Sequence, residues 1–228
     1  MNLTNYYYYF QQALSPRLVD DILAYGKSQE TELAVTGHGN PENKSNFTKK
    51  GKIKKSVVKN IQKKRKSDIV WMSDTWIYKE IHPYLNEANQ KAGWNYQWDF
   101  SESCQFTRYG VGDYYGSHTD SWDKPYMRPL NEDGTRPRDH GKIRKLSMTI
   151  SLSHPEEYEG GNFEVDLRNS ADYDGMKKGK NTAIRTVTEI RPRGSIIIFP
   201  SFVWHRVAPV TKGTRYSLVV WSLGYPFR

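Results

Sequence analysis

Hydrophobic and polar residues alternate along the second half of the chain in a pattern typical of β-strands. The clearest case is residues 145–152, where leucine, methionine and isoleucine occupy every second position and Lys145, Ser147, Thr149 and Ser151 lie between them. Shorter runs rich in β-branched and aromatic residues also predict strands, at residues 104–109, 113–115, 162–167, 195–200, 202–207 and 215–223. This half of the chain should therefore be mainly β.

The first half has helical spacing instead. Apolar residues recur every three or four positions from Ser73 to Ala92, and Gly93 follows as a helix-ending residue. Ser15 and Pro16 form a cap and a first-turn proline for a helix over residues 16–28. A short strand, Tyr6–Phe10, precedes that helix. We expect two N-terminal helices that pack against a β-sandwich or barrel.

Three polar stretches predict loops. They cover residues 36–55, 123–143 and 168–188, and are rich in glycine, proline or charge. Long insertions in a tight β domain are usually functional or disordered. Residues 123–143 carry or adjoin aromatic and arginine side chains, so we expect this loop either to cover a substrate or to be a solvated insertion.

The chain has 228 residues, which suits one domain: residues 1–95 as helical support and 96–228 as a β core. The aromatic content of 14% also favours a β-rich core. A lone cysteine, Cys104, excludes an intrachain disulfide and an all-cysteine zinc site. The N-terminus has no secretory pattern, and no apolar run reaches membrane-spanning length. We expect a cytoplasmic protein with no membrane partner.

The net charge of +9 comes from one segment. Residues Lys44–Lys66 hold 11 of the 34 basic residues and no acidic residue, which leaves 34 − 11 = 23 basic against 25 acidic residues elsewhere. Such an arm can bind polyanions, but a solvated segment is the more common case. Val57, Val58 and Ile61 could form the apolar side of a short amphipathic helix there.

The strongest candidate for chemistry is His118-Thr119-Asp120. Side chains two positions apart leave the same face of an extended chain, so this histidine and carboxylate can share a metal. An H-x-D pair alone arises by chance in roughly one such chain in three. A competing pair, His154 and Glu156, lies between two strand patterns and reads as a solvated loop. We favour His118 and Asp120.

His205 is the best candidate for a third ligand, because it alone among the remaining histidines lies in a β pattern. If residues 208–212 form a hairpin turn, His205 pairs with Arg215 across the two strands. Arg215 would then share an inward face with Ser217, Val219 and Trp221. A guanidinium inside a barrel is costly unless an anion meets it, so this hairpin predicts an anion site beside the metal.

Three stretches resemble one family. They are residues 108–120 (RYGVGDYYGSHTD), residues 146–152 together with Tyr158-Glu159-Gly160-Gly161, and residues 194–221 with His205-Arg206-Val207-Ala208-Pro209-Val210. Their order and spacing are similar to those of the Fe(II)/2-oxoglutarate dioxygenases, in the prolyl 4-hydroxylase-like branch that includes the PKHD-type hydroxylases. The resemblance covers residues 104–223. It implies a double-stranded β-helix core, of the jelly-roll or cupin-like kind, packed by N-terminal helices.

The resemblance also implies roles for particular residues. His118, Asp120 and His205 would bind Fe(II), and Arg215 would bind the distal carboxylate of 2-oxoglutarate. The remaining positions that match are Tyr109, Thr149 and Trp221, which would line the co-substrate pocket, and Tyr115, which would border the substrate. O2 is the other co-substrate, and ascorbate is a candidate reductant.

The implied activity is hydroxylation of a substrate C–H with release of succinate and CO2, on peptidyl-proline within a protein or peptide. Asp120 favours hydroxylation over halogenation. Several alternatives stay open: the same chemistry on a free amino acid, another side chain, or a nucleobase held through Lys44–Lys66, although the near-neutral core disfavours nucleic acid. A non-catalytic β-barrel binding protein and a zinc hydrolase are the remaining hypotheses.

Overall fold

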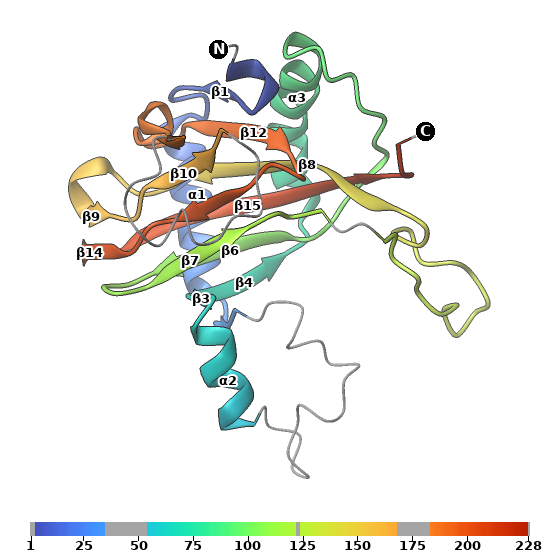
Figure 1. Ribbon diagram of the computed structural model, residues 1–228, viewed down its shortest axis with the longest axis horizontal. Coiled ribbons are helices and arrows are strands. Elements are labelled where there is room, and N and C mark those ends of the chain that lie inside the picture. The colour runs from blue at the N-terminus through green and yellow to red at the C-terminus, as the bar shows by residue number, and fades with distance from the viewer. Residues whose placement is uncertain (1–2, 35–53, 122–123, 168–182, 228) are drawn as a thin grey trace.

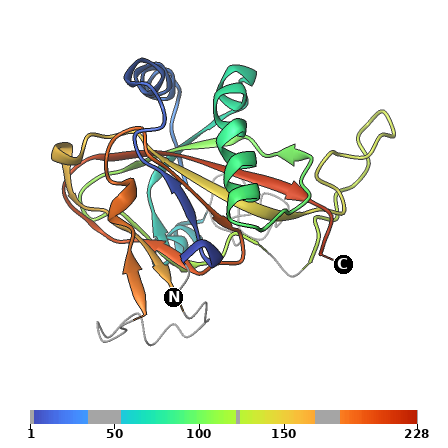
Figure 2. The same cartoon turned by 90° about the horizontal axis from the view of Figure 1, so that it is seen from above.

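Two helices, a large sheet and a small sheet form three successive layers (Figures 1 and 2). The computed structural model describes residues 3–34, 54–121, 124–167 and 183–227. Within these residues all strand pairs are antiparallel. The fold is mainly β, with the double-stranded β-helix core that the sequence predicts.

The large sheet has eight strands in the order β1-β12-β8-β15-β6-β4-β2, and β5 pairs with β15. Their bounds are β1 Tyr8–Phe10, β2 Glu32–Leu33, β4 Asp68–Met72, β5 Phe100–Ser101, β6 Cys104–Tyr109, β8 Ile143–Ser151, β12 Ile196–Pro200 and β15 Arg215–Gly224. The predicted strands of this sheet are confirmed to within two residues at each end. β4 went unrecognised in the sequence because its five residues, DIVWM, lie directly between the basic segment and the helical pattern that begins at Ser73.

The small sheet has five strands in the order β11-β10-β13-β7-β3, and a separate pair is formed by β14 and β9. Their bounds are β3 Arg65–Lys66, β7 Tyr114–His118, β9 Tyr158–Gly160, β10 Phe163–Asp166, β11 Ile184–Thr186, β13 His205–Val207 and β14 Val210–Gly213. β11 lies inside the range that we expected to be a loop, so that expectation is wrong for its last residues. Residues 168–182 of the same range lie outside the described part.

The two long helices cover the outer face of the large sheet (Figure 2). They are α1, Pro16–Ser28, and α3, Thr75–Lys91, and both are where the sequence predicts them. The Ser15 hydroxyl accepts a hydrogen bond from the Leu18 backbone N–H, which satisfies one free donor of the first turn of α1. Gly93 follows α3 with a φ of +75°, a conformation that glycine adopts without strain.

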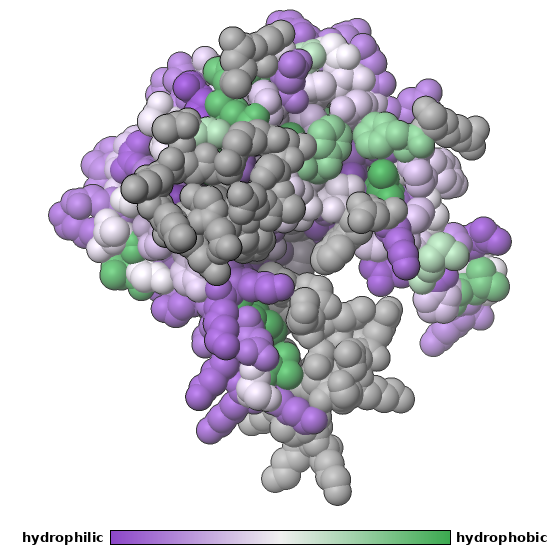
Figure 3. All heavy atoms as spheres, in the orientation of Figure 1, coloured by the Kyte–Doolittle hydropathy of each residue, from purple (hydrophilic) through white to green (hydrophobic). Residues whose placement is uncertain are grey.

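A third, shorter helix lies within the basic segment. It is α2, Lys55–Gln62, and it projects from the edge of the small sheet next to β3 (Figure 1). Ile61 is buried and Val57 and Val58 are half-buried, which confirms the short amphipathic helix. Hydrophilic residues gather along this projection (Figure 3). The described helices include none long and apolar enough to cross a membrane.

Both faces of β8 are buried, although its alternation suggests one solvated face. Leu146, Met148 and Ile150 pack against the helices. Ser147 and Thr149 point the other way, into the space between the two sheets, and are at most 5% exposed. Polar side chains on an inner face need partners, so this face is where a site should be sought.

The predicted hairpin between His205 and Arg215 is wrong. β14 occupies most of the expected turn and pairs with β9, while β15 lies in the other sheet between β6 and β8. Arg215 is opposite Tyr109, and His205 is opposite both His118 and Val165. Most residues of β15 are buried on both of its faces, as in a central strand and not in one arm of an isolated hairpin.

Candidate active site

His118, Asp120 and His205 come together at one end of the small sheet. His118 ends β7, His205 begins the neighbouring β13, and the two residues are direct cross-strand partners. One ligand atom from each of the three side chains lies within 4.8 Å of the others. The His118 Nε2 atom is 3.5 Å from one Asp120 carboxylate oxygen, and the His205 Nε2 atom is 3.7 Å from the other.

Backbone carbonyls fix which nitrogen of each ring faces the cluster. The His118 Nδ1 atom lies 2.8 Å from the Gly116 oxygen, and the His205 Nδ1 atom lies 2.9 Å from the Val203 oxygen. A carbonyl only accepts hydrogen bonds, so both Nδ1 atoms carry a proton, and Nε2 is the nitrogen of each ring that faces the cluster. Burial and the adjacent His118 ring lower the pKa of His205 to about 4, so His205 is neutral near pH 7. Two imidazole nitrogens and a carboxylate therefore converge, which is the set of donors that a divalent cation takes.

Two serines orient the carboxylate of Asp120. The Ser147 hydroxyl donates a 2.7 Å hydrogen bond to Asp120 and lies 2.9 Å from the Ser201 hydroxyl. The Ser201 backbone oxygen accepts from the Asp120 backbone N–H at 2.8 Å. Asp120 is 6% exposed, so these bonds replace water that the carboxylate has lost on folding.

Tyr115 stacks on His118, with ring centroids 3.5 Å apart and planes 13° from parallel. Residues three apart on a regular strand point to opposite faces, but the register between β7 and β13 shifts here and brings both rings to one side. The Arg65 guanidinium covers Tyr115 at 4.5 Å and donates to Ser67 and Gln105. Burial raises the pKa of Tyr115 to about 12, which keeps its hydroxyl protonated.

Arg215 points into the space between the sheets. It is 3% exposed, its guanidinium lies 5.4 Å from the Tyr109 ring, and it donates to the Ser217 hydroxyl at 3.3 Å. None of the described carboxylates pairs with it. Phe163 lines the same small cavity as Arg215 and is 5.4 Å from the His205 ring, so the cation and the metal cluster lie on two sides of one phenylalanine.

The predicted pocket residues Thr149 and Trp221 also lie on the inner face, on the paired strands β8 and β15. Trp221 is buried, and its indole N–H is one of two buried side-chain atoms in the described residues that lack a hydrogen-bond partner. The Arg144 guanidinium lies 3.9 Å above the Trp221 ring and forms an ion pair with Glu102. A buried N–H group without a partner, such as that of Trp221, is expected where a bound ligand accepts the hydrogen bond.

A model of the 2OG-Fe(II) oxygenase superfamily matches residues 104–223, slightly more than half of the chain. The protein belongs to this superfamily. Membership implies Fe(II), 2-oxoglutarate and O2, and the match contains the histidine–aspartate–histidine cluster and Arg215 together.

Among similar proteins, a PKHD-type hydroxylase of Hyphomonas neptunium is 36% identical over 113 residues, 49% of this chain and 38% of that protein. A PKHD-type hydroxylase of Thermosynechococcus vestitus is 34% identical over 116 residues, 51% of this chain and 40% of that protein. The match therefore spans less than half the length of either relative.

Solved structures agree in fold over nearly the whole chain. A prolyl-4-hydroxylase of Pseudomonas putida superposes with a TM-score of 0.59 and 18% identity, covering 96% of this chain and 94% of that one. A collagen prolyl hydroxylase of Paramecium Bursaria Chlorella virus-1, in its 2OG complex, gives 0.56 and 18%, covering 96% of each chain. At 18% sequence identity, the similarity to these two structures shows a shared fold only.

The donor set of this oxygenase fits Fe(II) better than a structural zinc ion, which normally takes four protein ligands. The supporting residues Arg65, Ser147 and Ser201 were missed in the sequence. Ser147 could have been found, because it shares the polar side of an alternating strand with Thr149. Nothing local marks Arg65, whose place depends on β3 pairing with β7.

Proposed function

We propose that this oxygenase is an Fe(II)- and 2-oxoglutarate-dependent hydroxylase that acts on peptidyl-proline. The observation that carries the proposal is a buried cluster of two imidazoles and a carboxylate, one phenylalanine away from a buried guanidinium that pairs with none of the described carboxylates. In such a reaction 2-oxoglutarate becomes succinate and CO2 while a substrate C–H is hydroxylated. Iron would activate O2, and the protein would bind and orient the substrates and exclude water from the site.

In this proposal His118, Asp120 and His205 hold the metal through Nε2, a carboxylate oxygen and Nε2. The carbonyls of Gly116 and Val203 keep each imidazole oriented, so the ligand atoms face one another before the metal arrives. Ser147 fixes the carboxylate in the same way. A site with three protein ligands leaves the remaining coordination positions for co-substrates.

Arg215 would bind the distal carboxylate of 2-oxoglutarate, because a buried guanidinium without a carboxylate partner is stable only beside an anion. Tyr109 lies across the strand pair from Arg215 and would form a wall of that pocket. Thr149 and Trp221 would line it further along the inner face, where the Trp221 N–H has an unused hydrogen bond to donate.

Tyr115 would border the substrate, and the aromatic rings around the cluster would keep water away from a reactive centre. Phe163 and Phe199 both contact the His205 ring, at centroid distances of 5.4 and 4.6 Å. Excluding water also strengthens every electrostatic contact inside the compartment.

The decisive experiment incubates the protein with Fe(II), 2-oxoglutarate and proline-containing peptides. We expect succinate to form and the peptide mass to rise by one oxygen atom. His118→Ala and Asp120→Ala should abolish both. His154→Ala is the matched control, because His154 belongs to an exposed histidine–glutamate pair far from the cluster and should leave turnover unchanged.

The outcomes separate chemistry from substrate. Succinate without peptide oxidation would support the oxygenase chemistry on a free amino acid or another side chain. Absence of both metal uptake and 2-oxoglutarate turnover would favour the binding-protein hypothesis, and a zinc-loaded protein indifferent to 2-oxoglutarate would favour a hydrolase.

A nucleobase substrate is the second candidate, since α2 presents exposed lysines beside the strand that borders the metal site. Deleting residues 44–66 would test it poorly, because Arg65 and Lys66 form β3. A sharper test replaces three exposed lysines on α2 and its end, Lys55, Lys59 and Lys63, with glutamine. Salt-dependent binding to DNA or RNA that these changes remove would support this candidate.

We further propose that residues 1–228 act as one dioxygenase domain, in which residues 1–95 support a core formed by residues 96–228. Helices α1 and α3 bury the outer face of the sheet whose inner face carries Arg215, which supports this division. Ascorbate dependence and a cytoplasmic location stay predictions.

A further inference from the structure

A second cavity of about 570 Å³ lies apart from the metal cluster, where the loop after α3, the start of β8 and the end of the described chain meet. Its size is typical of small-molecule pockets. Aromatic side chains form much of its lining, namely Tyr96, Trp98, Tyr225 and Phe227. Tyr96 and Phe227 pack edge to face at 4.8 Å.

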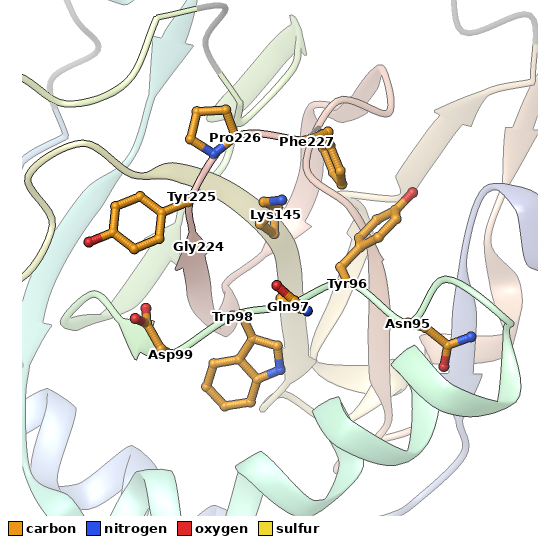
Figure 4. Close-up of a pocket in the computed structure, with 10 residues that line it drawn as sticks. All are labelled: Asn95, Tyr96, Gln97, Trp98, Asp99, Lys145, Gly224, Tyr225, Pro226 and Phe227. Atoms are coloured by element: carbon orange, nitrogen blue, oxygen red, sulfur yellow. The ribbon is translucent and has the colours of Figure 1, made fainter.

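Lys145 projects from β8 into the centre of this cavity, with Tyr225 on one side and Tyr96 and Phe227 on the other (Figure 4). The residue is 4% exposed. Its ammonium lies 3.6 Å from the Phe227 ring centroid. Among the described residues it has neither a hydrogen-bond acceptor nor a carboxylate partner.

The acidic residue that lines the cavity already has another partner. Asp99 lines the same cavity, but it forms a 2.7 Å ion pair with Lys142, not with Lys145. Burial lowers the pKa of Lys145, and no charged group offsets that effect. The ammonium faces both the cavity and an aromatic ring, and an anion in the cavity would give it a charge partner that none of the described residues supplies.

The walls are rigidly placed. A Cβ atom on Gly224 would lie 2.2 Å from the Gln97 backbone oxygen, so the end of β15 and the loop of residues 95–99 are in direct backbone contact. The Lys145 backbone oxygen accepts a hydrogen bond from Ser201, whose own oxygen accepts from Asp120. Two backbone hydrogen bonds therefore link Lys145 in the cavity wall to Asp120 in the metal-ligand cluster.

We infer that this cavity is a second ligand site, which binds a carboxylate carried on an aromatic body through Lys145. The carboxylate pairs with the ammonium, and the ring packs among Tyr96, Trp98 and Phe227. Both a free aromatic acid and an acidic residue next to an aromatic one in a peptide have this chemistry. The inference does not depend on the proposed hydroxylation.

The test uses the full chain and phenylacetate as a probe, with the neutral phenylacetamide as its matched partner, in calorimetric or NMR titrations up to about 10 mM. We expect the acid to bind at least about tenfold more tightly than the amide, since only the acid forms a charge-assisted hydrogen bond. Lys145→Met should remove that difference, and Lys145→Arg should keep most of it.

Two controls locate the probe. Arg215→Met should leave phenylacetate binding unchanged, which shows that the acid is not in the compartment of the metal cluster. Lys145→Met should melt no lower than the wild type, because it replaces a largely buried cation that pairs with none of the described carboxylates. A blocked tripeptide, acetyl-Phe-Glu-Phe-amide, and its glutamine counterpart then distinguish a peptide-borne carboxylate from a free one.

Equal affinity for acid and amide, no binding of either, or full binding by Lys145→Met would overturn the inference. So would loss of phenylacetate binding in Arg215→Met. Binding of the free acid alone supports a small-molecule site, and binding of the glutamate peptide supports a peptide-anchoring site.

Discussion

Charged side chains of the two sheets differ in whether the protein itself neutralises them. Arg144 has Glu102, and Arg206 has Glu164. Arg215 pairs with none of the described carboxylates, although it is more buried than either of those two arginines, and its guanidinium contacts the Ser217 hydroxyl and the Tyr109 ring. Folding keeps such a residue at a cost of stability, so its retention points to a ligand rather than to the fold.

Replacing Arg215 with methionine should separate these two roles. The apparent affinity for 2-oxoglutarate should fall about 10- to 100-fold, because a charge-assisted contact contributes roughly 1.5–3 kcal/mol. The melting temperature should not fall. Succinate formation at varied 2-oxoglutarate concentrations and a thermal melt measure the two effects.

Arg206→Met is the matched control for that change. Arg206 lies on β13 beside His205 but forms a surface-facing ion pair with Glu164, so its replacement should leave the co-substrate affinity unchanged. Equal losses in both variants would show that general damage to the sandwich, not a lost anion contact, explains the result.

The Cys104 thiol should be unreactive in the folded protein. It is fully buried, and burial raises the pKa of its thiol to about 12, so at pH 8 only about one molecule in 10⁴ carries a thiolate. Iodoacetamide should therefore modify Cys104 only in denaturant, as followed by mass spectrometry. Rapid modification of the native protein at pH 8 would mean that this part of the sheet opens readily.

At the scale of elements, the sequence predicted what local patterns can encode and missed what depends on distant partners. Periodicity placed α1, α3 and most strands of the large sheet, because each buries its own apolar face. The prediction of a hairpin through residues 208–212 was wrong, because it assumed that two strands joined by a short connection also pair with each other. The inward direction of Arg215 was still predicted correctly, because side chains alternate between the two faces of a strand whichever strands lie beside it.

The candidate cluster shows the same division. His118 and Asp120 are close in sequence and could be paired from spacing. His205 could be selected because it alone among the remaining histidines lies in a β pattern, but no local rule says that β13 lies beside β7. Arg65 could not be found at all: its contact with Tyr115 depends on a two-residue strand in a segment outside the family match.

The contact between α1 and the large sheet offers a test at this scale. Gly26 lies against the Phe106 ring, and a Cβ atom there would be 2.5 Å from a ring carbon. Gly26→Ala should destabilise the protein by about 1–3 kcal/mol in a urea titration, even though alanine normally favours helices.

A double variant identifies the cause. Adding Phe106→Leu to Gly26→Ala should cost less than the sum of the two single changes, because the smaller side chain makes room for the methyl group. Strict additivity would mean that the clash is relieved by a shift of α1 instead.

At the scale of the whole molecule, the charge is divided between a near-neutral body and one basic segment. Lys55, Lys59 and Lys63 are exposed, and their four-residue spacing places them on one side of α2. Replacing all three with glutamine should lower the salt concentration at which the protein leaves a heparin column, and should reduce the salt dependence of polyanion binding by up to about three units of slope.

Turnover of a small peptide should be unaffected in that triple variant, since the lysines touch none of the site residues. Unchanged heparin retention would assign the polyanion affinity to another part of the chain. Lys27, on α1, provides a comparison lysine, since it lies over the Tyr216 ring on the outer face of the large sheet.

The cross-strand pairing of His118 with His205 has a consequence for folding. The two residues are 205 − 118 = 87 positions apart, yet they are direct partners on β7 and β13. A bound metal would join them as a reversible staple, and closing so long a loop restricts the unfolded chain much as a disulfide does. In a protein with a single cysteine, the metal would then be the cross-link that the sequence otherwise lacks, and chelation would loosen the sandwich itself.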